Sequence, residues 1–214
     1  MAPAFPATAL ERRALALGWD RTRALADGAG RLRGSARLGV AGLNPDAGGD
    51  DIAPRDYFVV RGGVDVEAAI PVGTSRVVLR TIAASVGASG ALSQGVPEQD
   101  AVYFGGPVTG PGYGFHSLAG ESAVSQRVEW QSRIPFISLD LGRFGRVPSS
   151  LVVAPYVHGV WLDRPLRGSP GWHPAAGIAT IGIFDLLRFD VSRGLRDGRW
   201  LFSVDVAREF WPVL

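Results

Sequence analysis

Histidine is rare and cysteine absent in this chain, and the spacing of the other candidate residues fits neither catalysis nor metal binding. The three histidines, His116, His158 and His173, show no i, i+4 arrangement with a carboxylate between them. Neither Ser122 nor Ser125 lies in the Gly-x-Ser-x-Gly turn that presents a nucleophilic serine. The chain also lacks cysteine, which removes thiol catalysis, disulfides and zinc–thiolate sites. The sequence therefore predicts a protein that is not an enzyme and needs no metal or cofactor.

Charged residues instead mark one face of a predicted strand. Arg127, Glu129 and Arg133 all fall at odd positions, so their side chains point to the same side of an extended chain. Such charges suit the wall of a water-filled lumen, where they either form salt bridges across it or stay hydrated. Asp185 and Asp190 flank apolar residues, which predicts a turn and a lumen-facing position rather than catalysis.

Composition excludes several classes of partner and one kind of anchor. The glycine-rich segment 105–112 lacks the Gly-Lys-Ser/Thr ending of a phosphate-binding loop, so no nucleotide site is predicted. Every basic residue is arginine, and the net charge of +2 includes no basic stripe of the kind that nucleic-acid binding needs. No run of about 18 or more uncharged apolar residues occurs, so the sequence excludes a transmembrane helix.

The elements that must position these charges are strands, and the last strand is the most regular. From Gly198 to Trp211 apolar and polar side chains alternate with a period of two. Ten residues of strand cover roughly 33 Å, or about 25 Å once tilted, which matches the apolar band of an outer-membrane β-barrel. A long strand of a soluble sandwich would show the same alternation. The predicted lipid-facing residues are Trp200, Phe202, Val204, Val206 and Phe210.

Alternation recurs along most of the chain. It is regular over residues 31–42, 58–72 and 122–136, and less regular over 75–88, 149–163, 172–183 and 187–195, with one weak segment at 10–20. These segments are longer than the roughly 5–6 residues typical of strands in soluble sheets. We therefore expect an all-β protein without helices, an antiparallel transmembrane β-barrel that contributes about eight strands and has a wet lumen.

One connection, residues 89–120, is far too long for a hairpin. Its central part, Tyr103 to Phe115, contains five glycines and two prolines interleaved with aromatic residues. Loops of this length are usually functional or disordered, and the aromatic content favours a compact, ordered loop. We expect this loop to fold into the lumen as a plug or latch.

The loop carries the short motifs Gly105-Gly106-Pro107, Gly112-Tyr113 and Ser117-Leu118, and the segment from Phe184 to Leu195 follows it near the end of the chain. Together they resemble the outer-membrane assembly-factor superfamily, also called bacterial surface antigens, which includes BamA, TamA and two-partner secretion transporters. The resemblance covers roughly residues 30–211 and implies the C-terminal half of a 16-stranded barrel, whose sixth extracellular loop folds into the lumen and is followed by five strands. The loop residues that carry or border the matching motifs are Gly105, Gly106, Pro107, Pro111, Gly112, Tyr113, Phe115, Ser117 and Leu118.

Two positions depart from the family pattern. Pro111 occupies the place of the family's loop arginine, which contacts acidic groups on the inner barrel wall. Val157 occupies the place of the matching aspartate on a later strand. Loss of both partners is physically coherent, because a buried charge without its partner is strongly destabilising. The departures argue against insertase or secretion activity.

The expected organisation has three parts. Residues 1–30 form a weakly structured start or partial strand, residues 31–211 form the barrel domain with the inserted loop, and residues 212–214 form a tail. Residues 1–20 contain no basic stretch followed by an apolar one, so we expect an export signal upstream of Met1. The resemblance implies a location in the cell outer membrane, with lipid as the main partner and unfolded outer-membrane or secreted proteins as clients.

Three functions fit these residues. The resemblance implies a role in the insertion or translocation of proteins at the outer membrane, through pairing of client strands with the barrel seam. A non-transporting anchor or structural barrel of a larger protein is favoured by Pro111 and Val157. A soluble small-ligand-binding β-barrel stays open as well, because eight strands can close on their own.

Overall fold

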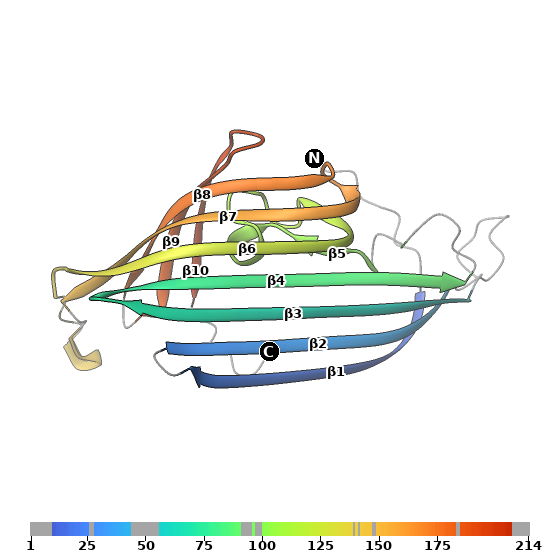
Figure 1. Ribbon diagram of the computed structural model, residues 1–214, viewed down its shortest axis with the longest axis horizontal. Coiled ribbons are helices and arrows are strands. Elements are labelled where there is room, and N and C mark those ends of the chain that lie inside the picture. The colour runs from blue at the N-terminus through green and yellow to red at the C-terminus, as the bar shows by residue number, and fades with distance from the viewer. Residues whose placement is uncertain are drawn as a thin grey trace.

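A computed structural model gives the architecture of the chain (Figure 1). It describes residues 10–25, 28–43, 56–90, 96, 100–138, 140, 142–146, 149–182 and 185–206, with side chains from Val60 onward except at 88–90 and 144. Two features expected from the sequence lie outside these ranges: the position of Phe210 and the tail at 212–214.

Almost all of the described chain is β-strand, which confirms the predicted all-β, antiparallel fold class. Ten strands form one sheet, and they follow one another in the order β1-β2-β3-β4-β6-β7-β8-β9-β10, with β5 paired to β6 alone. The strands are β1 Leu10–Leu25, β2 Gly28–Leu43, β3 Asp56–Val72, β4 Ser75–Gly90, β5 Val102–Phe104, β6 Leu118–Pro135, β7 Ser150–Arg167, β8 Gly171–Gly182, β9 Leu187–Gly194 and β10 Trp200–Val206. The other described elements are a single-turn helix, α1 (Gly106–Thr109), and a 3-10 turn, η2 (Gly142–Phe144).

Most predicted strands agree with the observed ones to within a few residues, and the differences have local causes. The weak segment at 10–20 is a full strand that pairs with β2 along its whole length. The strand expected from Ser122 begins earlier, at Leu118, because its first residues pair with β5. The expectation of no helix is wrong for one turn, since Pro107 occupies the start of α1, where its missing N–H costs nothing.

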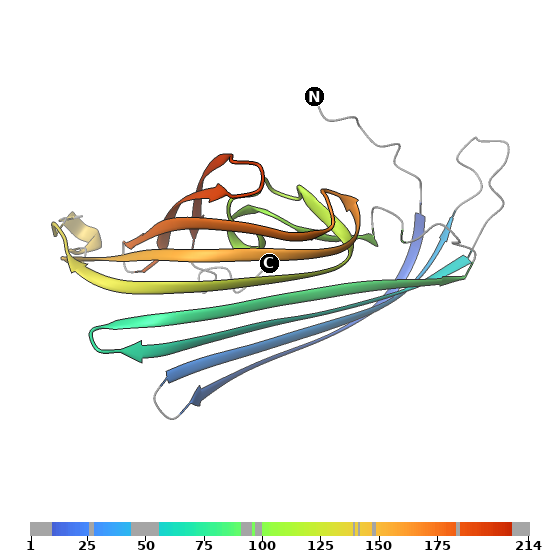
Figure 2. The ribbon, with the colours of Figure 1, turned by 45° about the horizontal axis from the view of Figure 1, so that its top comes forward.

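The sheet curls strongly but stays open. Figures 1 and 2 show β9 and β10 turned back toward the concave side of the sheet, where α1 contacts β10. Within the described ranges no ladder joins β1 to β10, so the outer edge of each strand carries backbone groups without a strand partner. The described chain thus forms a curved antiparallel sheet, and the closure that a barrel requires is not observed in it.

The two faces of the sheet differ in polarity. We call the concave side, which the 96–117 connection covers, the inner face, and the opposite side the outer face. In β6 the inner-face side chains of Ser125, Glu129 and Gln131 are buried, whereas Val128 and Trp130 between them are 46% and 45% exposed. Every long strand with described side chains exposes large apolar residues on the outer face: Val60, Val66, Ile70, Val72, Leu79, Val128, Trp130, Ile134, Val157, Trp161, Trp172, Ile178, Phe189, Val191, Trp200, Phe202 and Val204.

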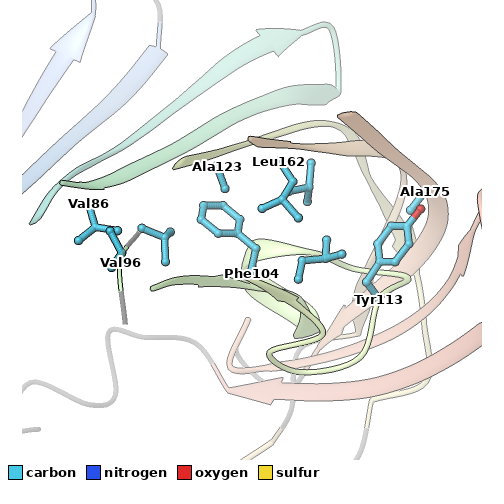
Figure 3. Packing of buried hydrophobic residues seen from close by; sticks show 10 residues of the cluster. Val86, Val96, Phe104, Tyr113, Ala123, Leu162 and Ala175 are labelled. Carbon is cyan, nitrogen blue, oxygen red and sulfur yellow. The ribbon is translucent and has the colours of Figure 1, made fainter. Parts of the chain in front are cut away.

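The main apolar core lies between the inner face and the connection from β4 to β6, which we call the inner loop (described at Val96 and over residues 100–117). The loop packs its apolar side chains against four strands of the curved sheet (Figure 3). It contributes Val96, Val102, Phe104 and Tyr113, and the wall contributes Val86, Leu118, Ala123, Val160, Leu162 and Ala175. The sheet therefore curls around a core that its own loop supplies.

Glycine allows the inner loop to fold tightly on itself. Gly105 has a φ of 115°, and a Cβ at this position would lie 2.1 Å from the carbonyl oxygen of Gly114. The Gly106 N–H donates to the Tyr113 carbonyl at 2.8 Å, and the Tyr113 N–H donates to the Gly110 carbonyl at 3.0 Å. These bonds satisfy backbone groups that would otherwise be buried without partners.

Replacing Phe104 tests the contribution of this core. The ring of Phe104 is 2% exposed, so Phe104→Ala should lower the free energy of unfolding by about 3–5 kcal/mol. Phe115 lies in the same loop but is 76% exposed, and Phe115→Ala should change stability by no more than about 0.5 kcal/mol. Equilibrium urea unfolding measures both changes, and equal midpoints for the two variants would show that the loop is not packed as described.

Candidate functional site

A polar cavity of about 260 Å³ lies on the inner face beside α1, whose Val108 lines it. Its wall comes from strands on both sides of the curl, so β3 and β4 face β9 and β10 across it. The charged residues that line it are Asp65, Glu67, Arg76, Arg80, Arg127, Glu129, Asp185, Arg188 and Asp205. The inner loop therefore fills one part of the interior, and paired charges surround the other part.

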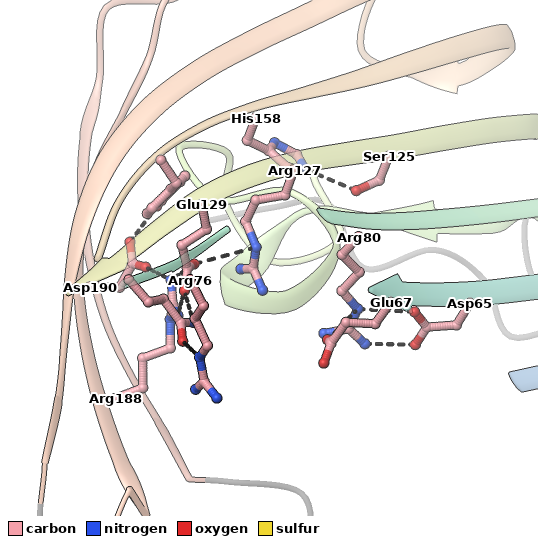
Figure 4. A network of polar contacts seen from close by, with 12 residues as sticks. Asp65, Glu67, Arg76, Arg80, Ser125, Arg127, Glu129, His158, Arg188 and Asp190 are labelled. Atoms are coloured by element: carbon pink, nitrogen blue, oxygen red, sulfur yellow. Dashed lines mark hydrogen bonds and ion pairs between the residues drawn. The ribbon is translucent and has the colours of Figure 1, made fainter. Parts of the chain in front are cut away.

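Arg188 and Glu129 form the central contact of this cavity (Figure 4). The Arg188 Nη1 and Nη2 donate to the two Glu129 carboxylate oxygens at 3.0 Å and 2.7 Å. Glu129 is only 1% exposed, and the Gln131 amide donates to the same carboxylate. Arg188 lies on β9 and Glu129 on β6, so this bidentate pair spans the inner face over β7 and β8.

A second buried carboxylate joins the same guanidinium. Arg188 Nη2 also donates to Asp190 at 3.1 Å, and Asp190 accepts a hydrogen bond from the Tyr156 hydroxyl at 2.5 Å. The strand between them makes room for this group, because Gly177 faces Tyr156 in the β7–β8 register. A Cβ at Gly177 would lie 2.5 Å from the Tyr156 ring. The Arg188 guanidinium thus pairs with two buried carboxylates. Both need this partner, because a buried charge without a partner is strongly destabilising.

On the opposite wall a separate ion pair links neighbouring strands. Arg80 of β4 donates to Asp65 of β3 through Nε at 2.9 Å and Nη2 at 2.6 Å. The Arg80 Nε also lies 3.8 Å from a carboxylate oxygen of Glu67. This bidentate geometry fixes the guanidinium of Arg80 against the β3 wall.

Two buried side chains, Ser125 and His158, form a hydrogen-bonded pair that resembles part of a nucleophilic site. The Ser125 hydroxyl lies 2.8 Å from His158 Nε2. His158 Nδ1 has no hydrogen-bond partner in the described part of the chain, whereas a catalytic histidine is oriented by a third group at this nitrogen. Neither residue lines the polar cavity. The pair is therefore best explained as a packing contact of the inner face.

The tip of the inner loop is bound to the sheet by polar contacts. The Tyr113 hydroxyl donates to the Pro174 carbonyl of β8 at 2.7 Å, and burial raises the pKa of this phenol, which keeps its proton in place. At the other end of the loop, Arg61 of β3 donates to the carbonyls of Asp100, at 2.6 Å, and of Ala101. The loop is thus attached to both sides of the curl.

The residues singled out in the loop sequence take different positions. Gly105, Gly106 and Pro107 lead into α1. Pro111, Gly112 and Tyr113 are buried against the wall, where Gly112 approaches Ala175 and Gly194. Phe115 points away from the wall and stacks on His116, with ring centroids 3.9 Å apart. The loop tip is therefore held against the wall without a charged side chain at position 111.

Not all of the residues predicted for the lumen wall and the lipid-facing side lie where the sequence places them. Arg127 and Glu129 line the polar cavity, whereas Arg133 does not line it and forms an exposed pair with Asp185 at 3.2 Å. Trp200, Phe202 and Val204 are 66%, 67% and 51% exposed on the outer face. Val206 differs from the expectation, because it is half-buried and lines the cavity. Its pairing with Leu187 keeps it in the same strand register as Val204.

One inference from the family pattern is wrong. The resemblance places Val157 at an acidic position of the inner wall, but the Val157 side chain is 60% exposed on the outer face. The inward positions of this part of β7 are Tyr156 and His158, which are buried. A residue at position 157 points away from the lumen because successive side chains of a strand alternate between faces.

Sequence reasoning missed the residues that complete the network, namely Arg80, Tyr156 and Arg188. In the sequence, the only indication of these residues is that they fall on the polar side of alternating strands. That alternation predicts which face they lie on but not which residues they contact. Arg188 and Glu129 are separated by 59 positions, and only the curl of the sheet brings them together.

Comparisons with known proteins add no identity to this geometry. No family model matches the chain, and no curated protein matches it either. In the described ranges, no group of three or more histidine or acidic side chains is arranged to hold a metal ion. No helix in this part of the chain is long and apolar enough to cross a membrane.

Neutralising Glu129 tests the network. Glu129→Gln should lower the free energy of unfolding by about 3 kcal/mol, because it leaves the buried Arg188 with Asp190 as its remaining acidic partner. Asp185→Asn is the matched control, since the Arg133–Asp185 pair is 54% exposed on both sides and should be worth no more than about 1 kcal/mol. Urea unfolding of both variants gives the comparison, and equal losses would contradict the assigned burial.

Proposed function

We propose that this chain forms part of the wall of a β-barrel embedded in the outer membrane. The observation that carries the proposal is the reversed polarity of the sheet, with exposed apolar residues outside and buried charges inside. Soluble monomers rarely expose apolar patches larger than a few hundred Å², whereas here the apolar residues extend over seven neighbouring strands, β3, β4 and β6 to β10. Lipid-facing strands of outer-membrane barrels have this apolar-out, polar-in alternation.

The position of two tryptophans supports the same proposal. Trp161 of β7 and Trp172 of β8 are cross-strand partners, and their rings meet edge to face with centroids 5.8 Å apart. Both are more than two-fifths exposed on the outer face, close to the turn that joins their strands. Aromatic residues at strand ends are typical of the membrane–water interface, where the ring is apolar and the indole N–H reaches water.

The open edges of the sheet indicate that further strands complete the barrel. Hydrocarbon offers no hydrogen-bond partners, so a membrane-spanning sheet must close. β1 and β10 are the first and the ninth strands of the meander and run in the same direction, whereas every described ladder is antiparallel. Joining β1 directly to β10 would require a parallel ladder. We infer that antiparallel closure includes an odd number of additional strands.

Within this class, the sequence resemblance favours a role in inserting or translocating proteins at the outer membrane. The open edge of β10 presents the backbone groups with which a client strand would pair. The second candidate is an anchor or structural barrel without transport. It is favoured by the buried loop tip, because Pro111 and Tyr113 are packed against the wall without the charge that the resemblance implies.

An arginine on the outer face tests the contact with lipid. Val204→Arg should lower stability by roughly 2–4 kcal/mol in protein folded into phosphatidylcholine vesicles, because the charge would lie near the bilayer midplane. Leu195→Arg is the matched control: Leu195 is 57% exposed, close to the 51% of Val204, but lies in the turn after β9. If urea unfolding in vesicles shows the same small change for both variants, a soluble barrel is the better description.

Folding of a client separates the two membrane functions. Vesicles that contain the protein should accelerate the folding of an unrelated outer-membrane barrel if the β10 edge accepts client strands. Protein-free vesicles of the same lipid are the control, and band shifts in gels without heating follow the folded fraction. Equal rates in the two kinds of vesicle would leave the anchor as the function.

A further inference from the structure

Arg127 is a cation for which the inner face provides no hydrogen-bond acceptor. Its side chain is 11% exposed and lines the polar cavity. Its closest acidic contact is Glu129, with 3.7 Å between Arg127 Nε and Glu129 Oε2, and within the described chain it donates no hydrogen bond. Its other contact is the Tyr156 ring, whose centroid is 5.9 Å from the guanidinium carbon. The guanidinium N–H donors of Arg127 thus have no hydrogen-bond acceptor within the described chain, and the residue lines the cavity.

The neighbouring carboxylates are already engaged by other groups. Glu129 accepts both hydrogen bonds of the bidentate pair with Arg188 and a third from Gln131. Asp65 accepts the bidentate pair from Arg80. Rotation of either carboxylate toward Arg127 would therefore break contacts that are shorter and better aligned than the new ones.

The strand register places a second cation, Arg80, directly opposite Arg127. Arg80 of β4 is its direct cross-strand partner, and His158 is its partner on β7. Like charges directly opposite each other on one face of a sheet destabilise the pairing. Arg76 lines the same cavity and bonds to the neutral amide of Gln131 through its Nε. Arg127 therefore lies opposite a second arginine and beside Glu129, whose carboxylate is engaged by Arg188, with the cavity before it.

We propose that the polar cavity binds one small oxyanion, a phosphate or a carboxylate group, against the guanidinium of Arg127. The planar fork of arginine matches the paired oxygens of these groups. A space of about 260 Å³ is below the roughly 300–1,000 Å³ of drug-sized ligand sites, so it suits a single ion with a few waters. Five carboxylates also line the cavity and disfavour a polyanion: Asp65, Glu67, Glu129, Asp185 and Asp205. The site depends on the inner-face geometry alone and not on the proposed membrane role.

Calorimetric titration tests the proposal with inorganic phosphate and, separately, with acetate. The refolded protein is kept in a chloride buffer at constant ionic strength, so a non-specific charge effect gives no signal. The variant is Arg127→Gln, and the control is Arg133→Gln, which removes an exposed arginine from the same face of the same strand. Wild type and Arg133→Gln should bind phosphate or acetate at one site, and Arg127→Gln should bind at least about tenfold more weakly. Which of the two ions binds identifies the oxyanion.

Stability without added anion is the second readout. Because Arg127 lies opposite Arg80 and donates no hydrogen bond, Arg127→Gln should unfold at a urea concentration no lower than wild type. A lower midpoint would mean that Arg127 stabilises the wall by itself and would overturn the proposal. Absence of binding of both ions to wild type, or equal binding by Arg127→Gln, would overturn it as well.

Discussion

The guanidinium of Arg188 holds the curved sheet together on its polar side. It joins Glu129 and Asp190, two carboxylates that are each 1% exposed, and the first of these lies three strands away. Burial of such charges costs several kcal/mol per ion, and the attraction within the network largely offsets this cost. The network therefore adds little net stability, but it fixes the relative positions of the strands that carry the charges. On its polar side, the curl of β6 to β9 is therefore held by this contact across the inner face, and the polar cavity lies beside it.

Small side chains on β8 make that contact possible. The inner positions of β8 around this point are Ala175, Gly177 and Ala179, which leave room for the Tyr156 ring and for the reach of Arg188 toward β6. The same narrow wall receives the loop tip, because Gly112 lies against Ala175 and the Tyr113 hydroxyl reaches Pro174. One strand without bulky inner residues thus accommodates both the ionic network and the inner loop.

The local half of this architecture could be predicted from the sequence, and the long-range half could not. Alternation in β3, β6 and β10 marks strands and faces, because side-chain direction depends only on neighbouring residues. It fails in β7, where Val160 and Leu162 of the inner face pack on the loop while Trp161 lies outside, so both registers are apolar. Because both registers of β7 contain apolar residues, the sequence does not show which side of this strand faces inward. The resemblance therefore places Val157 on the inner wall, although its side chain lies on the outer face. The partners of Arg188 depend on curvature, which no local pattern encodes.

In the proposed membrane role, a client protein could either pass through the interior of the barrel or pair with the free edge of the sheet. Passage through the lumen would require removal of the inner loop, whose buried Phe104, Val102 and Tyr113 each contribute about 1.5–3 kcal/mol. The bonds from Arg61 and Tyr113 to backbone carbonyls add to that cost. The outer edge of β10 needs no such rearrangement, because its backbone groups already lie in strand geometry without a strand partner in the described chain. A client would therefore meet a far smaller barrier at the edge than through the lumen, which makes strand pairing the physically favoured route of any insertion activity.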